Sequence, residues 1–316
     1  MPLHKGHVAL IHFAAQHCDE LIVSMSYKTS DPIPGPTRFE WIREEFKNFP
    51  KIEPQISLDD FDDESLSLEN RIPLWSDFLK RRFPFINVVF SSEDYGVLLA
   101  KSLGIEHILF DAGRVKFPVA ASKLRADPFK YWDLMADSTK PYFVKKICFY
   151  GPESTGKSFL SEKLAKRYKT EFVPEVAREL ISTNDFNMDE ILRIGNAQTK
   201  RVLEKIKVAN KILFCDTDLI TTEIYSRHYL RVVPPVLIEL ERKIKYDHYF
   251  LFDTSVEWVA DGMRDLGNRR EEMFNVFKTE LDKRGIAYDI VKGDYAEREE
   301  FVVKKIGEYF GVFPED

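Results

Sequence analysis

Residues 146–168 read KICFYGPESTGKSFLSEKLAKRY, and this stretch decides the fold of the second half of the chain. Its centre, GPESTGKS at 151–158, matches the phosphate-binding pattern G-x-x-x-x-G-K-[ST] in full. The apolar residues before the loop predict a buried strand. After the loop, Leu160, Leu164 and Tyr168 recur every four residues, which predicts a helix with one buried face. A strand, a glycine-rich turn and a helix N-terminus in this order indicate a site for nucleotide phosphates.

The phosphate loop predicts ATP as the bound nucleotide and Mg²⁺ as its metal ion. Lys157 would neutralise the charge of the β- and γ-phosphates, and the Ser158 hydroxyl would coordinate Mg²⁺. A glycine-rich turn that contains Gly-Lys-Ser by chance is the alternative, and the flanking strand and helix patterns argue against it. The predicted ATP-binding residues of the loop are Gly151, Ser154, Thr155, Gly156, Lys157 and Ser158.

Acidic residues follow two further strand candidates. Glu175 lies in PEVARE (174–179), and Asp216 and Asp218 lie in FCDTD (214–218). If a substrate hydroxyl receives a phosphoryl group from ATP, a nearby carboxylate is needed to take the proton of that hydroxyl. We assign Asp216 to Mg²⁺ or its water, while Glu175 and Asp218 are both candidates for the general base or for binding the substrate hydroxyl. Arg178 is a predicted substrate contact, and a strand-end cap remains the alternative role for each acid.

A basic segment with two glycines, DGMRDLGNRR, occupies residues 261–270. Its arginines, Arg264, Arg269 and Arg270, predict a lid that closes over the phosphates and stabilises their charge. A solvated charged surface is the alternative.

Short apolar runs alternate with helix-period segments along the whole chain, which predicts an α/β fold with mainly parallel sheets. The polar segment that ends at Pro141 separates two domains, residues 1–140 and 141–316. The strand candidates are Leu21–Met25, Ile86–Ser91, His107–Phe110, Lys146–Tyr150, Lys211–Cys215, Tyr249–Phe252 and Ala287–Val291.

Charge and composition narrow the class of partner. The 316-residue chain has a net charge of −6, which gives no general attraction to nucleic acid or to an anionic membrane. No apolar run reaches the length of a membrane span, and the cysteines, Cys18, Cys148 and Cys215, form no Cys-x-x-Cys pair. We expect a cytoplasmic protein with small-molecule partners and no nucleic-acid or membrane partner. Assembly into a homo-oligomer stays open.

A second set of phosphate-binding candidates lies in the first half. His4 and His7 are three residues apart at the start of an amphipathic helix, near the positive end of its dipole. Ser122 and Arg125 offer a hydroxyl and a guanidinium one turn apart. No carboxylate base accompanies them, and a phosphate nucleophile needs none because it is already ionised. The set, with His7 as its catalytic member, therefore predicts nucleotidyl transfer by charge stabilisation.

Taken together, these segments resemble a known family. HKGH (4–7) resembles the (H/T)-x-G-H signature of the nucleotidyltransferase superfamily, and ASKLRADPFKYW (121–132) resembles its S/T-x-x-R element. The other segments resemble the NadR type in order and spacing. That type is a bifunctional nicotinamide-nucleotide adenylyltransferase and ribosylnicotinamide kinase. The segments are SSEDYG, GPESTGKS, PEVARE, FCDTD followed by LITT, and DGMRDLGNRR.

The resemblance implies two doubly wound parallel-sheet domains, a Rossmann-like nucleotidyltransferase followed by a P-loop kinase. The second would phosphorylate nicotinamide riboside to nicotinamide mononucleotide (NMN) with ATP and Mg²⁺. The first would join NMN to AMP from ATP, giving NAD and pyrophosphate. His4, His7, Ser122 and Arg125 would hold ATP phosphates, and Arg38 and Trp75 would contact the mononucleotide. The alternative is a P-loop nucleoside kinase whose inert first domain senses a mononucleotide.

The sequence departs from the family pattern in its first half. Ala120 stands where the family's second element has a serine. The family also has a strand before the histidine motif, whereas only three residues precede His4. We interpret this as a start assigned too late, the alternative being an impaired adenylyltransferase half. These residues contain no helix-turn-helix segment, so a DNA-binding repressor role is not expected.

Overall fold

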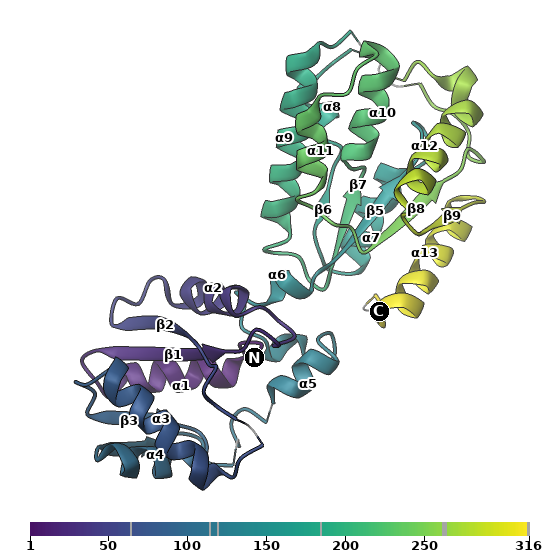
Figure 1. Ribbon diagram of the computed structural model, residues 1–316. Helices are drawn as coiled ribbons and strands as arrows, with labels where there is room; N and C mark the ends of the chain where they lie inside the picture. The colour runs from purple at the N-terminus through teal and green to yellow at the C-terminus, as the bar shows by residue number, and fades with distance from the viewer. Residues whose placement is uncertain (64, 114, 119, 184, 261–263, 315–316) are drawn as a thin grey trace. The chain divides into compact units, whose positions relative to one another are not determined.

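The computed structural model describes residues 1–316 apart from 64, 114, 119, 184, 261–263 and 315–316. The chain divides into two compact units, Met1–Lys140 (unit 1) and Pro141–Asp316 (unit 2), and each is described here by itself (Figure 1). Across the described residues, no helix combines the length and the apolar character that crossing a membrane requires.

Unit 2 is built on a five-stranded parallel sheet in the order β6-β7-β5-β8-β9. The first strand along the chain, β5, is central, and later strands add on both of its sides, so the winding direction reverses there. In sheets of this kind, ligands bind beyond the carboxyl ends of the strands at that reversal. The strands are β5 (Lys145–Tyr150), β6 (Phe172–Val173), β7 (Ile212–Asp216), β8 (His248–Phe252) and β9 (Tyr288–Val291).

Helices cover both faces of this sheet, which explains why its central strands are continuous apolar runs. On one face, Cys148 and Tyr150 pack with Ile224 and Phe277 from the helices α10 and α12. Phe149 alternates to the other face. The helices α9, α10 and α11 lie side by side in Figure 1. The helices of unit 2 are α7 (Lys157–Arg167), α8 (Ala177–Leu180), α9 (Met188–Lys205), α10 (Leu219–Leu230), α11 (Pro235–Glu241), η2 (Gly267–Arg269), α12 (Arg270–Arg284) and α13 (Tyr295–Phe310), with α6 (Lys140–Phe143) at its start.

Unit 1 also contains only parallel strand pairs among its described residues, but they form two sheets. β1 (Leu21–Tyr27) pairs with β2 (Ile52–Leu58), and β3 (Val88–Ser91) pairs with β4 (Glu106–Leu109). Helix α1 (Lys5–Gln16) contacts both β1 and β3. The other helices are α2 (Gly35–Phe46), α3 (Leu68–Arg82), α4 (Tyr95–Leu103), α5 (Ala121–Ala126) and η1 (Trp132–Leu134).

The α/β prediction is confirmed, and each strand candidate overlaps an observed strand. Two differences stand out. Strand β2 was not predicted because Pro54 interrupts its pattern, and it forms one side of a two-stranded pair, where a residue without an N–H is tolerated. The described strands of unit 1 also form two separate pairs, whereas one continuous doubly wound sheet was expected.

Candidate functional site

The phosphate loop joins β5 to α7 through backbone conformations that only glycine adopts easily. Gly151 has φ 134°, and a Cβ there would lie 2.8 Å from the carbonyl oxygen of Phe252. Gly156 has φ 84° and is the N-cap of α7, with the Tyr295 ring 2.9 Å from the position of a Cβ. Both glycines are therefore required by the local geometry. The loop leads into the N-terminus of α7 at the reversal point of the sheet.

Lys157 is the cation of this loop. Its Nζ donates to the carbonyl oxygen of Pro152 at 2.7 Å, and the Thr155 hydroxyl donates to the same oxygen at 2.9 Å. Burial lowers the pKa of Lys157, while the nearby carboxylates of Asp216 and Glu175 oppose that shift. Lys157 therefore lies close to both predicted acids, and their charge favours its ammonium form.

Asp216 ends β7 beside the phosphate loop, with 1% of its surface exposed. Burial, followed by the charge of Glu175, raises its pKa to about 6, against the opposing effects of Lys157 and a hydrogen bond with Ser158. Its Oδ1 is buried and accepts no hydrogen bond from the described residues. A carboxylate oxygen without a partner next to a serine hydroxyl fits Mg²⁺, which binds through one or two protein oxygens, phosphates and water. Ser158 and Asp216 are thus suitable ligands for that ion.

A cavity of about 340 Å³ extends from the phosphate loop. Glu175 and Arg178 line its polar part and form an ion pair at 2.9 Å. Other lining residues come from the loop itself, from Thr217 after β7 and from Thr221 and Thr222 on α10. Its apolar part is lined by Ile181, Phe186, Ile191, Ile194, Tyr225 and Tyr229. An elongated ligand with a planar apolar end and a polar end that reaches the loop suits this lining.

The apolar part of the cavity was missed by sequence reasoning. Ile191 and Ile194 recur at helical spacing on α9, and Tyr225 and Tyr229 on α10 lie four residues apart with stacked rings 6.3 Å between centroids. Such spacing is typical of a buried helix face, so the pattern alone predicts core residues. Gln198 also lines the cavity and was not predicted.

Asp218 differs from its predicted role because it lies outside the cavity lining, as the N-cap of α10. Its Oδ1 accepts from the backbone N–H and the hydroxyl of Thr221, and its Oδ2 accepts from the Tyr249 hydroxyl at 2.9 Å. Both oxygens are occupied by structural donors, and burial raises the pKa of Asp218 to about 6. The structure therefore gives this acid a capping role.

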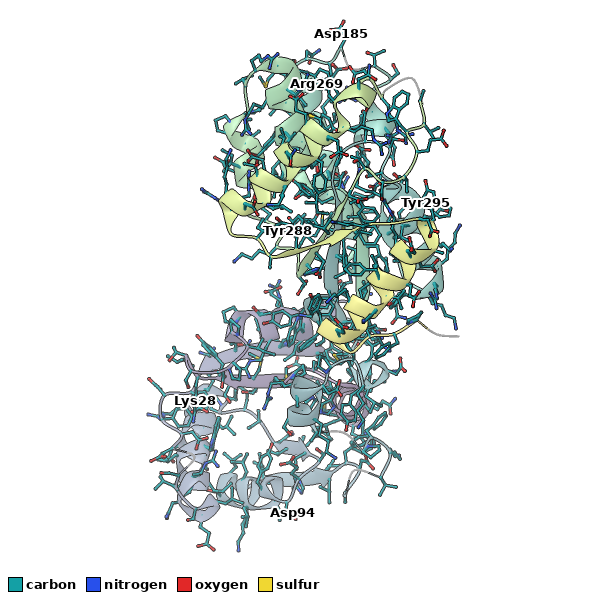
Figure 2. The ribbon with its side chains drawn as sticks, turned by 90° about the vertical axis from the view of Figure 1, so that its right-hand side faces the viewer. Lys28, Asp94, Asp185, Arg269, Tyr288 and Tyr295 are labelled. Atoms are coloured by element: carbon teal, nitrogen blue, oxygen red, sulfur yellow. The ribbon has the colours of Figure 1, made fainter. Side chains whose placement is uncertain are left out.

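The three arginines of the basic segment are placed differently; residues 261–263 of that segment lie outside the described residues. Arg264 lines the cavity and donates to the carbonyl oxygen of Val259 at 2.7 Å. Arg270 donates to the carbonyl oxygens of Ser154 and Val256 and thus ties the segment to the phosphate loop. Arg269 is exposed at the outer end of α12, where it pairs with Glu272 (Figure 2). Only Arg264 is in position to meet a ligand in the cavity.

Two loop side chains bind this basic segment and the residues just before it. The Glu153 carboxylate accepts from the backbone N–H of Leu266 at 2.9 Å, and the Ser154 hydroxyl accepts from that of Val259 at 2.8 Å. Tyr295, at the start of α13 (Figure 2), also lines the cavity and places its ring 5.2 Å from that of Phe159. The Ser154 side chain, predicted as a phosphate ligand, thus also binds the chain just before the basic segment.

In unit 1 the two histidines come together as predicted for one helix face. His4 is buried and caps α1, its Nδ1 accepting from the backbone N–H of His7 at 3.3 Å, and the two rings stack 3.7 Å apart. Ser122 and Arg125 lie exposed on the short helix α5. Arg125 donates to the carbonyl oxygen of Met1, close to the start of α1.

The predicted mononucleotide contacts have structural partners in unit 1. Arg38 is buried and forms an ion pair with Asp31. Burial lowers the pKa of the Met1 amine to about 6, and Arg125 and Arg38 add to that shift, so both cations lie near Met1. Trp75 packs its ring against Phe61, 5.0 Å between centroids, which places it in an aromatic cluster.

Comparisons with known proteins cover both units. A family model described as an AAA domain matches residues 146–298. The trifunctional NAD biosynthesis/regulator protein NadR of Escherichia coli (strain K12) is 28% identical over 338 residues, which span 98% of this chain and 81% of that protein. The protein with the same name from Salmonella typhimurium is 28% identical over 339 residues, with the same coverage.

Solved structures share the fold along the full length. A crystal structure of NadR protein in complex with NR has a TM-score of 0.85 at 22% identity, and covers 100% of this chain and 95% of that one. A crystal structure of NadR protein in complex with NAD and AMP-PNP has a TM-score of 0.82 at the same identity and coverage. The chain is thus similar to NadR proteins in sequence over 98% of its length and in fold over all of it.

Proposed function

We propose that unit 2 transfers the γ-phosphoryl group of ATP to the hydroxyl of nicotinamide riboside, giving NMN and ADP. One observation carries this proposal: the phosphate loop opens into a cavity that is lined by a carboxylate and by aromatic rings. A nucleoside fits that lining, with its ring among Phe186, Tyr225 and Tyr229 and its hydroxyl beside Glu175. The crystal structure of a NadR protein in complex with NR supports this choice of nucleoside.

In the proposed reaction, the substrate hydroxyl oxygen bonds to the γ-phosphorus, and the bond from that phosphorus to the bridging oxygen of ADP breaks. Glu175 accepts the hydroxyl proton, since it lines the cavity and Asp218 does not. Lys157 and Arg264 stabilise the phosphate charge. Ser158 and Asp216 would hold Mg²⁺, which neutralises further phosphate charge when bound.

Replacement of the loop lysine tests this function. Lys157→Met should lower NMN formation from ATP and nicotinamide riboside by about 1000-fold or more, because the transferred phosphate loses its cation. Lys163→Met is the matched control, since Lys163 is an exposed cation on the same helix and pairs with Glu299. Equal rates in Lys157→Met and wild type would refute the proposal. Glu175→Gln should likewise lose phosphoryl transfer, and Asp218→Asn should keep it.

We further propose that unit 1 transfers AMP from ATP to NMN, giving NAD and pyrophosphate. The stacked pair His4 and His7, with Arg125 and Arg38 close to the start of the same helix, supports this role. A NadR crystal structure in complex with NAD and AMP-PNP supports it too. His7→Ala should abolish NAD formation from NMN and ATP while leaving NMN formation intact. If wild type forms no NAD from NMN, this proposal for unit 1 is wrong, and measured binding of NMN to unit 1 would then support the alternative of an inert domain that senses a mononucleotide.

A further inference from the structure

Gln198 on α9 has an amide whose two ends are distinguishable from the structure. The side chain has 2% of its surface exposed and lines the cavity. Its Oε1 accepts from the backbone N–H of Val176 at 3.0 Å. A backbone N–H can only donate, so the atom that faces Val176 is the amide oxygen. The amide nitrogen is therefore the end that remains for other contacts.

That nitrogen, Nε2, is buried and has no hydrogen-bond partner among the residues that the structure describes. Buried donors are almost always paired, because a buried donor without an acceptor has lost its hydrogen bonds to water and gained none in exchange. The next residue, Thr199, follows this rule, since its buried hydroxyl donates to the carbonyl oxygen of Gly195 at 2.8 Å. Gln198 Nε2 is thus a neutral donor in the cavity wall without an acceptor in the described part of the chain.

The position of this donor within the cavity identifies the part of a ligand that it meets. Ile191, Ile194 and Gln198 are spaced by three and four residues, so they follow one another along one face of α9. The anchor of Gln198, Val176, directly follows Glu175 in the chain. Gln198 therefore shares a helix face with residues that line the apolar part of the cavity, and its anchor adjoins the carboxylate that takes the hydroxyl proton in the proposed reaction.

We propose that Gln198 is a substrate-binding residue whose amide nitrogen donates to an oxygen of the bound nucleoside. The acceptor is either a sugar hydroxyl oxygen or the carbonyl oxygen of a carboxamide on the ring. This assignment rests on the proposed kinase function of unit 2. It adds a specificity element, because a nucleoside without that oxygen leaves the donor unpaired when it fills the cavity.

The test combines one variant with substrate analogues in a double-mutant cycle. Gln198→Leu keeps the approximate size of the side chain and removes the donor. The dissociation constants of nicotinamide riboside and of ATP are measured by calorimetry with the full-length chain. We expect riboside binding to weaken by about 10- to 100-fold, the range for loss of a buried hydrogen bond, with ATP binding unchanged. Thr199→Val is the control, because Thr199 is also buried on the same helix and is not among the residues that line the cavity.

The analogues are the 2′-deoxy riboside, the 3′-deoxy riboside and the riboside without its carboxamide. One of them should bind wild type more weakly and suffer no further loss in Gln198→Leu, and that analogue identifies the oxygen. If each analogue loses the same factor in both proteins, or if ATP binding falls as much as riboside binding, the assignment is wrong. If Gln198→Leu does not fold, Gln198→Met goes through the same cycle. If the wild-type protein does not phosphorylate the riboside, the proposed kinase function of unit 2 is wrong.

Discussion

Arg298 joins the phosphate loop to the neighbouring strand ends, and its replacement should destabilise unit 2 strongly. The side chain lies on α13 with 1% of its surface exposed. Its guanidinium pairs with the Asp253 carboxylate at 2.6 Å and donates to the carbonyl oxygens of Thr155, Gly293 and Asp253. Arg298→Met would remove the charge and leave three carbonyl groups without this donor. Removal of one partner of a buried ion pair costs about 3–5 kcal/mol.

Hydrogen exchange of the full-length chain, followed by mass spectrometry, measures this loss in each unit separately. Amides of β5 and β8 in Arg298→Met should exchange roughly 1000-fold faster than in wild type, which corresponds to about 4 kcal/mol. Amides of unit 1 provide an internal reference. Lys304→Met is the control, because Lys304 is an exposed cation on the same helix. If Arg298→Met and Lys304→Met exchange at the same rate, Arg298 does not stabilise the loop region as described.

Three further predictions follow from the site. Asp218→Asn should raise the free energy of unfolding by up to about 3 kcal/mol over wild type at pH 7 and leave it unchanged near pH 3.5. The pKa of Asp218 in the folded chain, about 6, lies above its pKa in the unfolded chain. The wild-type free energy of unfolding therefore falls as the pH rises from about 4 to about 6. Urea titrations at both pH values measure this, and an equal gain at both would contradict it. Gly151→Ala should weaken ATP binding about 10-fold or more, because the new Cβ would lie 2.8 Å from the carbonyl oxygen of Phe252 at a φ that alanine avoids. An unchanged dissociation constant for ATP would contradict this prediction. Glu153→Ala should speed proteolysis of the segment 254–270, whereas Glu153→Gln should not, because glutamine still accepts from Leu266 N–H; identical cleavage rates would exclude this contact as an anchor.

The parts of the fold and site that depend on residues close together in the chain could be predicted from the sequence. The phosphate loop is one example, because strand, glycines and helix follow one another within 146–168. Asp216 is another, since an acid at the end of an apolar strand necessarily reaches the edge where the loop lies. Glu175 follows a strand of only two residues and still reaches the cavity.

The apolar part of the cavity could not be predicted, because nothing in one sequence shows which apolar helix face borders a cavity. Tyr225 on α10 and Ile194 on α9 have the spacing of core residues, and only the packing of the two helices leaves space between them. For Asp218 the sequence left a capping role and a substrate role open. It shares the strand-end pattern of Asp216, but it begins a helix, and Thr221 three residues later takes its carboxylate. A capping pattern therefore competes with a catalytic one wherever an acid precedes a helix.

The bond from Lys157 Nζ to the Pro152 carbonyl has a consequence for nucleotide affinity. A triphosphate that enters the loop competes for the ammonium group with an acceptor that the loop itself supplies. The Thr155 hydroxyl already donates to that same oxygen and would remain its donor after the exchange. Measured ATP binding therefore reports a difference between two lysine partners. Replacing Thr155 by valine should make the exchange less favourable, because the Pro152 carbonyl would then lose its remaining donor.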